Sequence, residues 1–247
     1  MTRKILILGA TSAIAHAYAR RMAVAGASLI LAGRNSEALE ANAADLRARG
    51  AAGVDIVVAD LAQVDRLDEM AAQCTAFGFP DVVLLAYGSL GDQARSQNDP
   101  QYAREVIDTN FTSAALWLLA LAKARPALQP ATVVVIGSVA GDRGRASNFV
   151  YGAAKGGLER FVQGLQHANA TGPLRIVLIK PGFVDTPMTS GIAGKGGPLW
   201  ASADKVAGDI VEAAQSGKSE VYSPWFWWGI MMIIRNLPSV IFNRMKI

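Results

Sequence analysis

Short runs of apolar residues, bounded by Gly, Pro or Asp, alternate along the chain with longer segments, most of which carry an apolar stripe at helical spacing. Buried parallel strands joined by crossover helices produce this alternation. The predicted strands lie near Lys4–Gly9, Ser28–Gly33, Val54–Ala59, Asp81–Ala86, Thr132–Gly137, Arg175–Lys180 and Glu220–Tyr222. The predicted helices cover Ser12–Ala25, Ser36–Arg49, Val64–Cys74, Tyr102–Ala124, Tyr151–Ala168 and Ala203–Ser216. We therefore expect an α/β fold with a doubly wound parallel sheet and helices on both faces.

The 247 residues contain no internal repeat and no Pro/Gly/Ser-rich linker long enough to separate two domains. We expect residues 1–222 to form one nucleotide-binding domain that includes the catalytic site. Residues 223–247, which are apolar and basic, are expected to extend that domain. The glycine-rich stretch Gly191–Pro198 is typical of the start of a mobile lid over a substrate.

Composition and charge exclude several classes of function. Hydrophobic residues make up 51% of the chain and charged residues 18%, as in compact globular proteins. The net charge of +4 is spread without a basic block, so we expect no nucleic-acid binding. Cys74 is single, and His16 and His167 lack partners in the sequence, so we expect no disulfide and no metal site. No apolar run suits a signal peptide or a membrane span, and we expect a cytoplasmic location.

The first predicted strand ends at Gly9 and leads directly into a helix. Backbone N–H groups at such a helix start can bind a pyrophosphate, although an ordinary strand-to-helix turn is the alternative. Alanines occupy positions 13 and 15, where glycines are usual, and each adds only a methyl group. We expect the dinucleotide to contact Gly9, Thr11, Ser12, Ala13 and Ile14.

The second predicted strand ends in Gly33-Arg34-Asn35, without the acidic residue that would hold the ribose hydroxyls of NAD(H). Arg34 offers a permanent positive charge for a 2′-phosphate. The alternative, a solvated arginine at a helix N-terminus, is unfavourable with respect to the helix dipole. NADP(H) is therefore favoured over NAD(H). Asp60 and Leu61, just after the third strand, are expected to border the adenine.

The most specific pattern is Ser138 after an apolar strand, followed by Tyr151 and Lys155 at the start of a helix. Residues four apart share one helical face, and a nearby ammonium lowers the pKa of a phenol. Tyr151 is then expected to exchange a proton with a carbonyl oxygen while the Ser138 hydroxyl holds that oxygen. A surface Tyr–Lys pair is the alternative, and the strand context argues against it.

With these motifs the sequence resembles the short-chain dehydrogenase/reductase family from Ile5 to Tyr222. The resemblance implies a Rossmann-type fold, a homodimer or homotetramer, and Asn110 as a fourth catalytic residue that orders a water beside Lys155. It also implies cofactor contacts from two loops. These contacts involve Ala86, Tyr87 and Gly88 after the fourth strand, and Pro181, Gly182, Val184 and Thr186 after the sixth. The usual Asn-Asn-Ala-Gly is here Leu85-Ala-Tyr-Gly88, which puts the local bracing of the sheet in doubt more than the chemistry.

Two stretches, Gly141–Tyr151 and Met231–Phe242, are similar to members of this family that reduce a keto-sugar carried on a polyprenyl phosphate. That resemblance implies a lipid-linked carbonyl substrate and a separate flavin oxidase as partner. Arg143 and Arg145 are then candidates to meet the substrate phosphate, and a solvated loop is the alternative. The tail is expected to be an oligomer interface, a flap over the active site, or a peripheral contact with the inner membrane.

Two other functions fit the same residues. One is reduction of a different carbonyl, in a small ketone or an acyl carrier thioester intermediate. The other is a regulator that binds NADP(H) without turnover.

Overall fold

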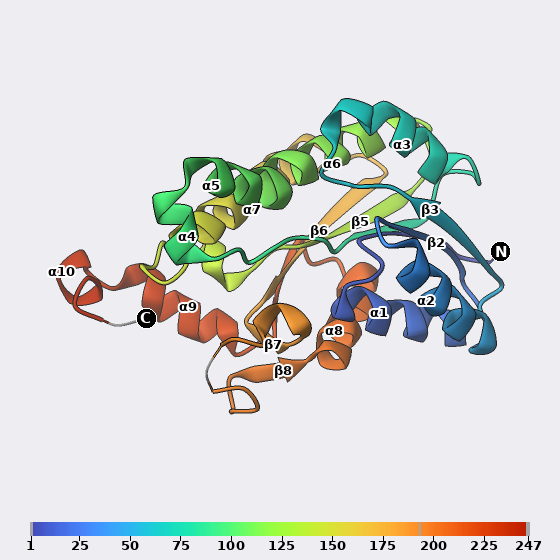
Figure 1. Cartoon of the computed structure of the whole chain (residues 1–247). Coiled ribbons are helices and arrows are strands. Elements are labelled where there is room, and N and C mark those ends of the chain that lie inside the picture. Colours follow the sequence, from blue (N-terminus) through green and yellow to red (C-terminus); the bar gives the residue numbers. More distant parts are fainter. Residues whose placement is uncertain (1, 193, 246–247) are drawn as a thin grey trace.

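The computed structural model describes residues 2–192 and 194–245. Its centre is a parallel sheet in the order β3-β2-β1-β4-β5-β6-β9 (Figure 1). The strands are β1 (Lys4–Leu8), β2 (Ser28–Gly33), β3 (Gly53–Val58), β4 (Val82–Leu85), β5 (Ala131–Ile136), β6 (Leu174–Pro181) and β9 (Glu220–Ser223). Each of the predicted strands is confirmed.

Side chains at alternate strand positions enter two cores, one on each face of the sheet. In β1, Ile5 and Ile7 lie in one core, whereas Leu6 and Leu8 lie in the other. The first face is covered by α1 (Ala13–Val24), α2 (Ser36–Ala48) and α8 (Ala203–Gln215). The second is covered by α3 (Leu67–Thr75), α6 (Ser113–Ala124) and α7 (Phe149–Ala168). The fold is therefore the predicted doubly wound one, in a single domain.

The strand order reverses around β1, which pairs with β2 on one side and β4 on the other. A crevice outside the carboxyl ends of the strands is expected at such a point. Gly9 follows β1 with φ of +86°, and a Cβ atom there would lie 2.7 Å from the Cβ of Tyr87, which follows β4. The glycine lets the two loops lie in contact at the base of this crevice.

The predicted helix Tyr102–Ala124 is interrupted. It consists of α5 (Pro100–Ile107), a π turn (Asp108–Thr112) and α6, and a short helix α4 (Gln93–Asn98) precedes it. Asp92 and Asp99 cap α4 and α5 by accepting backbone N–H hydrogen bonds at 2.8 and 3.1 Å. These caps, together with Pro100 at the first position of α5, separate α4 from α5. Periodicity alone predicts a loop in place of α4 and one long helix after it.

After β6 the chain forms a small parallel sheet of β7 (Phe183–Asp185) and β8 (Trp200–Ser202). The predicted lid lies between these strands, and its Ala193 falls outside the described residues. The C-terminal extension forms α9 (Trp227–Asn236) and α10 (Ser239–Phe242), which reaches beyond the body (Figure 1). Among the helices that the structure describes, none is long and apolar enough to cross a membrane.

Candidate active site

Two adjoining cavities occupy the crevice, of about 560 Å³ and about 270 Å³. They share Gly9, Thr11, Arg34, Tyr87 and Gly88, so they form one continuous groove. The larger is also lined by Ser12, Ala13, Ile14, Ala86, Ser138, Tyr151, Lys155, Pro181, Gly182, Val184 and Thr186. The smaller adds Asp60 and Leu61. The groove therefore brings together nearly all the residues that the sequence singled out.

The start of α1 fits a dinucleotide. Ser12 caps the helix through its Oγ, which accepts a hydrogen bond from the backbone N–H of Ala15 at 3.2 Å. Ala13 lines the larger cavity, whereas Ala15 is fully buried in the core beneath α1. Only one of the two alanine methyl groups thus lies where a pyrophosphate would approach. The glycine turn, the helix start and the adjoining groove together have the form of an anion cradle.

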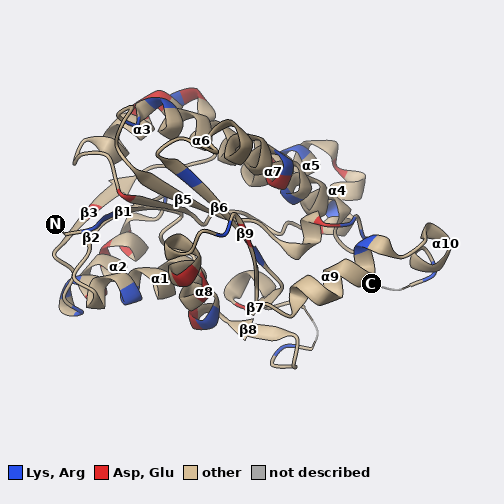
Figure 2. Cartoon of the chain, turned by 180° about the vertical axis from the view of Figure 1, so that it is seen from behind, with Lys and Arg blue, Asp and Glu red and all other residues tan. Residues whose placement is uncertain are grey.

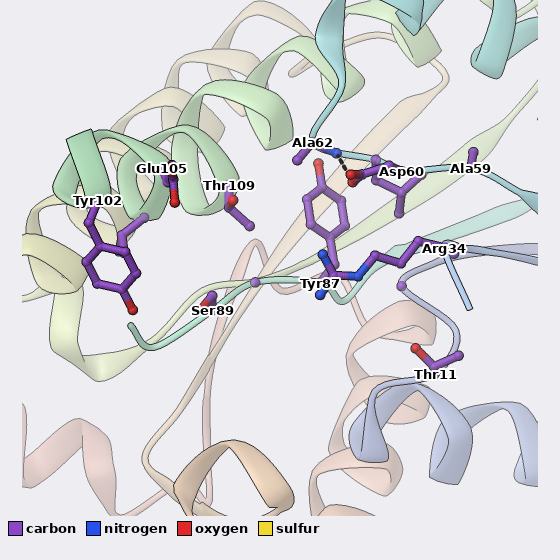
Figure 3. Close-up of a pocket in the computed structure, with 15 residues that line it drawn as sticks. Thr11, Arg34, Ala59, Asp60, Ala62, Tyr87, Ser89, Tyr102, Glu105 and Thr109 are labelled. Carbon is purple, nitrogen blue, oxygen red and sulfur yellow. Dashed lines mark hydrogen bonds between the residues drawn. The ribbon is translucent and has the colours of Figure 1, made fainter. Parts of the chain in front are cut away.

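Arg34, Asp60 and Tyr87 surround the smaller cavity (Figure 3). Arg34 is exposed, and none of the ion pairs among the described residues involves it, so its guanidinium is available to an anion. One carboxylate oxygen of Asp60 accepts a hydrogen bond from the backbone N–H of Ala62 at 3.1 Å. Leu61 is buried and supplies an apolar wall. This end of the groove suits a charged nucleotide.

Ser138, Tyr151 and Lys155 line the larger cavity. Ser138 follows β5, and its Oγ accepts a hydrogen bond from the backbone N–H of Ala140 at 3.1 Å. Tyr151 and Lys155 are one turn apart on α7, with the ammonium 5.9 Å from the centre of the phenol ring. Lys155 Nζ donates to the backbone carbonyl of Ile136, at the end of β5, at 3.1 Å. This bond fixes the ammonium beside the two hydroxyl groups.

Burial governs the protonation of this pair. It raises the pKa of Tyr151 to about 12, and a hydrogen bond with Ser138 offsets part of that rise. It also lowers the pKa of Lys155 to about 8. The pKa of Tyr151 therefore lies above its usual value in this structure and not below it as predicted, because burial is the largest influence on it. The phenol is protonated at neutral pH, which is the state that can donate a proton.

Asn110 lies in the π turn and is fully buried. Its Nδ2 donates to the carbonyls of Ser89 and Val106 at 2.7 and 2.8 Å, and its Oδ1 accepts from the N–H of Ser89 at 3.1 Å. A Cβ atom at Gly88 would lie 2.6 Å from that Oδ1 and 3.5 Å from Lys155 Nζ. Asn110 thus lies near Lys155 and braces the loop after β4. Its role with a water stays a prediction.

The phenol of Tyr87 braces the same loop. Its hydroxyl shares a hydrogen bond of 3.1 Å with Ser113 Oγ at the start of α6. Burial raises the pKa of Tyr87, so this hydroxyl stays protonated. Tyr87 and Asn110 therefore tie the loop to the π turn and α6, which accounts for the loop's order without the usual asparagine.

The segment after β6 lies against the tail. A Cβ atom at Gly182 would lie 1.9 Å from the indole nitrogen of Trp227, so only glycine allows this packing. Thr189 Oγ1 donates to the carbonyl of Val184 at 2.5 Å and accepts from the N–H of Thr186 at 3.2 Å. These bonds hold Val184 and Thr186, two of the residues expected to contact the cofactor, at the wall of the larger cavity.

Arg143 does not line either cavity. Its guanidinium donates to the carbonyls of Ile234 and Leu237 at 2.5 and 2.6 Å and lies 3.8 Å from the centre of the Phe242 ring. The prediction that Arg143 meets the substrate is therefore wrong. The last carbonyls of α9 have no partner within the helix, and a cation at a helix C-terminus is favourable.

Arg145, in contrast, lines the larger cavity with Ser138 and Tyr151. Its Nη2 donates to the carbonyl of Val139 at 3.1 Å, while its buried Nε has no hydrogen-bond partner among the described atoms. Burial lowers the pKa of Arg145, whose partly desolvated guanidinium lines the same cavity as the Ser138 and Tyr151 hydroxyls.

A buried ionic cluster behind the site was missed by the sequence analysis. Lys180, at the end of β6, is fully buried and pairs with Asp142 and with Glu159, the latter at 2.9 Å. The Tyr222 hydroxyl lies 3.1 Å from Lys180 Nζ and donates to Asp142 at 3.0 Å. Burial alone would lower the pKa of Lys180, but these hydrogen bonds raise it above its usual value. The one sequence signal was Glu159, which continues the four-residue spacing of Tyr151 and Lys155.

The cluster joins the parts of the active site. Asp142 lies in the loop after Ser138, and Glu159 is on the helix that carries Tyr151. Lys180 directly precedes Pro181. One ammonium thus fixes three segments that meet at the larger cavity.

Comparison with known proteins decides the family. Residues 3–195 match the family model described as short chain dehydrogenase. The chain belongs to the short-chain dehydrogenase family. An uncharacterized oxidoreductase of Mycobacterium tuberculosis is 36% identical over 242 residues, which cover 98% of this chain and 96% of that protein. The sulfoacetaldehyde reductase of Chromohalobacter salexigens is 30% identical over 258 residues, covering 100% and 94%.

The same fold occurs in a short chain dehydrogenase from Burkholderia cenocepacia, solved in complex with NADP. Its TM-score is 0.81 at 17% identity, and the match covers 98% of this chain and 97% of that one. Family membership makes the chain an oxidoreductase. Among the described residues no group of three or more His, Cys, Asp or Glu side chains could hold a metal ion.

The Lys180 cluster gives a prediction about stability. Lys180→Met leaves Asp142 and Glu159 as uncompensated buried carboxylates, so the free energy of unfolding should fall by ~3–5 kcal/mol. Lys123→Met removes an ion pair with Asp68, in which both side chains are exposed, and should cost ~0–1 kcal/mol. Urea unfolding of both variants provides the measurement. Equal losses would show that the buried cluster contributes no more than a surface pair.

Proposed function

We propose that this short-chain dehydrogenase reduces a carbonyl group to an alcohol with NADPH. The observation that carries the proposal is the placement of Ser138, Tyr151 and Lys155 on the wall of a groove that continues to Arg34. A bound nicotinamide would supply the hydride. Ser138 Oγ holds the carbonyl oxygen, and the protonated Tyr151 donates its proton to that oxygen as negative charge develops there. The Lys155 ammonium stabilises the phenolate that remains.

The preference for NADPH rests on the end of β2. Arg34 is exposed there without an ion-pair partner among the described residues, and no acidic side chain stands at the three positions directly after the strand. A guanidinium suits the 2′-phosphate that distinguishes NADPH from NADH.

For the substrate we propose a keto-sugar carried on a polyprenyl phosphate. The proposal follows from the resemblance of two stretches to decaprenylphosphoryl-2-keto-ribose reductase, and such a ketone would arise from a separate flavin oxidase. Arg145, at the larger cavity, is suited to the phosphate. The second candidate is a small anionic carbonyl compound. The charge of the same arginine favours it, and one relative is named for such a substrate, the sulfoacetaldehyde reductase.

The catalytic assignment predicts the effect of removing one hydroxyl. Tyr151→Phe should lower kcat for ketone reduction by ~10²–10⁴ because no other group donates the proton. NADPH should still bind, as followed by its fluorescence. A non-catalytic NADP(H)-binding regulator would bind without turnover in the wild type as well, and full activity in the variant would refute the role of Tyr151.

Substrate class is tested at Arg145. Arg145→Gln should raise KM for a polyprenylphosphoryl 2-keto-pentose by roughly tenfold or more, since a hydrogen bond to a charged group contributes ~1.5–3 kcal/mol. KM for a neutral soluble ketone should change little. KM for an acyl carrier thioester intermediate, as a third substrate class, is measured in the same way. Equal changes for all substrates would mean that Arg145 does not recognise the anion.

The cofactor preference is tested at Arg34. Arg34→Asp should raise the Kd of NADPH by ~10–100-fold through loss of the phosphate contact and through repulsion, and should leave the Kd of NADH nearly unchanged. Arg160→Asp, at an exposed arginine of α7, controls for the change in net charge. If Arg34→Asp weakens both cofactors alike, Arg34 does not read the phosphate.

The pKa of Lys155 predicts the pH dependence. Because burial lowers it to about 8, the ammonium is charged below that pH and loses its charge above it. The rate of ketone reduction at saturating NADPH should therefore fall as the pH rises through about 8. In Lys155→Arg the charge persists, and the fall should move to higher pH. A wild-type rate that stays constant well above this range contradicts the role of the ammonium.

A further inference from the structure

The helix α9 is apolar on two opposite faces. Trp227 and Met231 on its inner face pack against Val139 and Tyr222 of the body. Its outer face carries Trp228 and Ile233, whose exposed fractions are 59% and 66%. Met232 of the same helix is also exposed, and exposed apolar side chains continue before the helix at Trp225 and after it at Val240, Ile241 and Met245. We call this set the outer apolar face. A patch of this kind on one short segment indicates an interaction surface.

The charges of the tail have one sign. After Glu220 the sequence contains no Asp or Glu, whereas Arg235, Arg244 and Lys246 are basic. Figure 2 shows α9 almost without charged residues. Its one arginine, Arg235, lies in the last turn. Tryptophans beside basic residues match the headgroup level of a bilayer that contains anionic lipids. The length of α9, 10 residues, suits a helix that lies in the plane of the surface.

The tail is held firmly to the active site. The rings of Trp227 and Phe183 lie edge to face with centres 5.5 Å apart, and Phe183 lines the larger cavity. Arg143, five residues after Ser138, binds the last carbonyls of α9 and covers Phe242. The outer apolar face therefore has a fixed position relative to the larger cavity.

We propose that the outer apolar face docks the enzyme on a membrane surface that contains anionic phospholipids. Apolar side chains enter the boundary between headgroups and acyl chains, and the net positive charge of the tail attracts the lipid phosphates. Docking holds the cavity beside the bilayer, where a carbonyl substrate with an acyl or prenyl chain would be presented. The docking itself does not require that the proposed substrate be correct.

The test uses the full-length protein and vesicles of phosphatidylcholine, with or without phosphatidylglycerol. We expect co-sedimentation with the mixed vesicles, weaker binding to pure phosphatidylcholine, and loss of binding as salt is raised. The double variant Trp228→Asp/Ile233→Asp should bind the mixed vesicles at least about tenfold more weakly, because two charges replace buried apolar area. NADPH binding and the thermal unfolding midpoint verify that this variant is folded.

Leu128→Asp is the matched control, since Leu128 is 89% exposed and lies before β5, outside the tail. It should bind vesicles as the wild type does. Tyr151→Phe should also bind them normally, so failure of the proposed reaction and failure of docking are distinguishable.

Two results would overturn the proposal. One is wild-type protein that stays in the supernatant with mixed vesicles. The other combines three observations: the wild type sediments as a dimer, the double variant sediments as a monomer, and neither protein binds vesicles. A second copy of the chain would then cover the outer apolar face.

Discussion

The active site depends on one buried ammonium. Lys180 is fully buried and holds Asp142, Glu159 and Tyr222 around it. Through them it joins the loop of Ser138, the helix of Tyr151 and the strand that leads into the tail. Taking these charges out of water is costly, and their mutual attraction repays the cost only in good geometry. Relative displacement of the three segments would break that geometry, so the same cluster that stabilises the fold keeps the hydroxyls of Ser138 and Tyr151 in register.

Most of the sheet could be predicted from the sequence because each strand is a short apolar run between turn residues, and both faces are buried. The interruption of the predicted helix Tyr102–Ala124 could not be predicted from the sequence. Its π turn contains Asn110, whose amide donates hydrogen bonds to Ser89 and Val106. Helical periodicity does not contain those tertiary contacts. The ionic cluster was hidden for a similar reason, since Lys180 and Asp142 are 38 residues apart.

The candidate site was predictable where roles follow from local spacing, as for Tyr151 and Lys155 on one face of α7. Prediction failed where the environment decides. The ammonium beside a phenol suggested a lowered pKa for Tyr151, but burial raises that pKa and lowers the pKa of Lys155. Arg143 and Arg145 are two residues apart in one loop, yet one binds the end of α9 and the other lines the cavity. Sequence alone does not reveal which way each points.

The contact between Gly182 and Trp227 links the loop after β6 to the tail at a single point. Because a side chain at position 182 would occupy the space of the indole, the glycine and the tryptophan constrain each other. A relative with a larger residue at the position of Gly182 must place its C-terminal segment elsewhere. In a relative without the tryptophan, packing against the tail does not require glycine at that position. The pair is thus a marker that divides relatives with this tail arrangement from those without it.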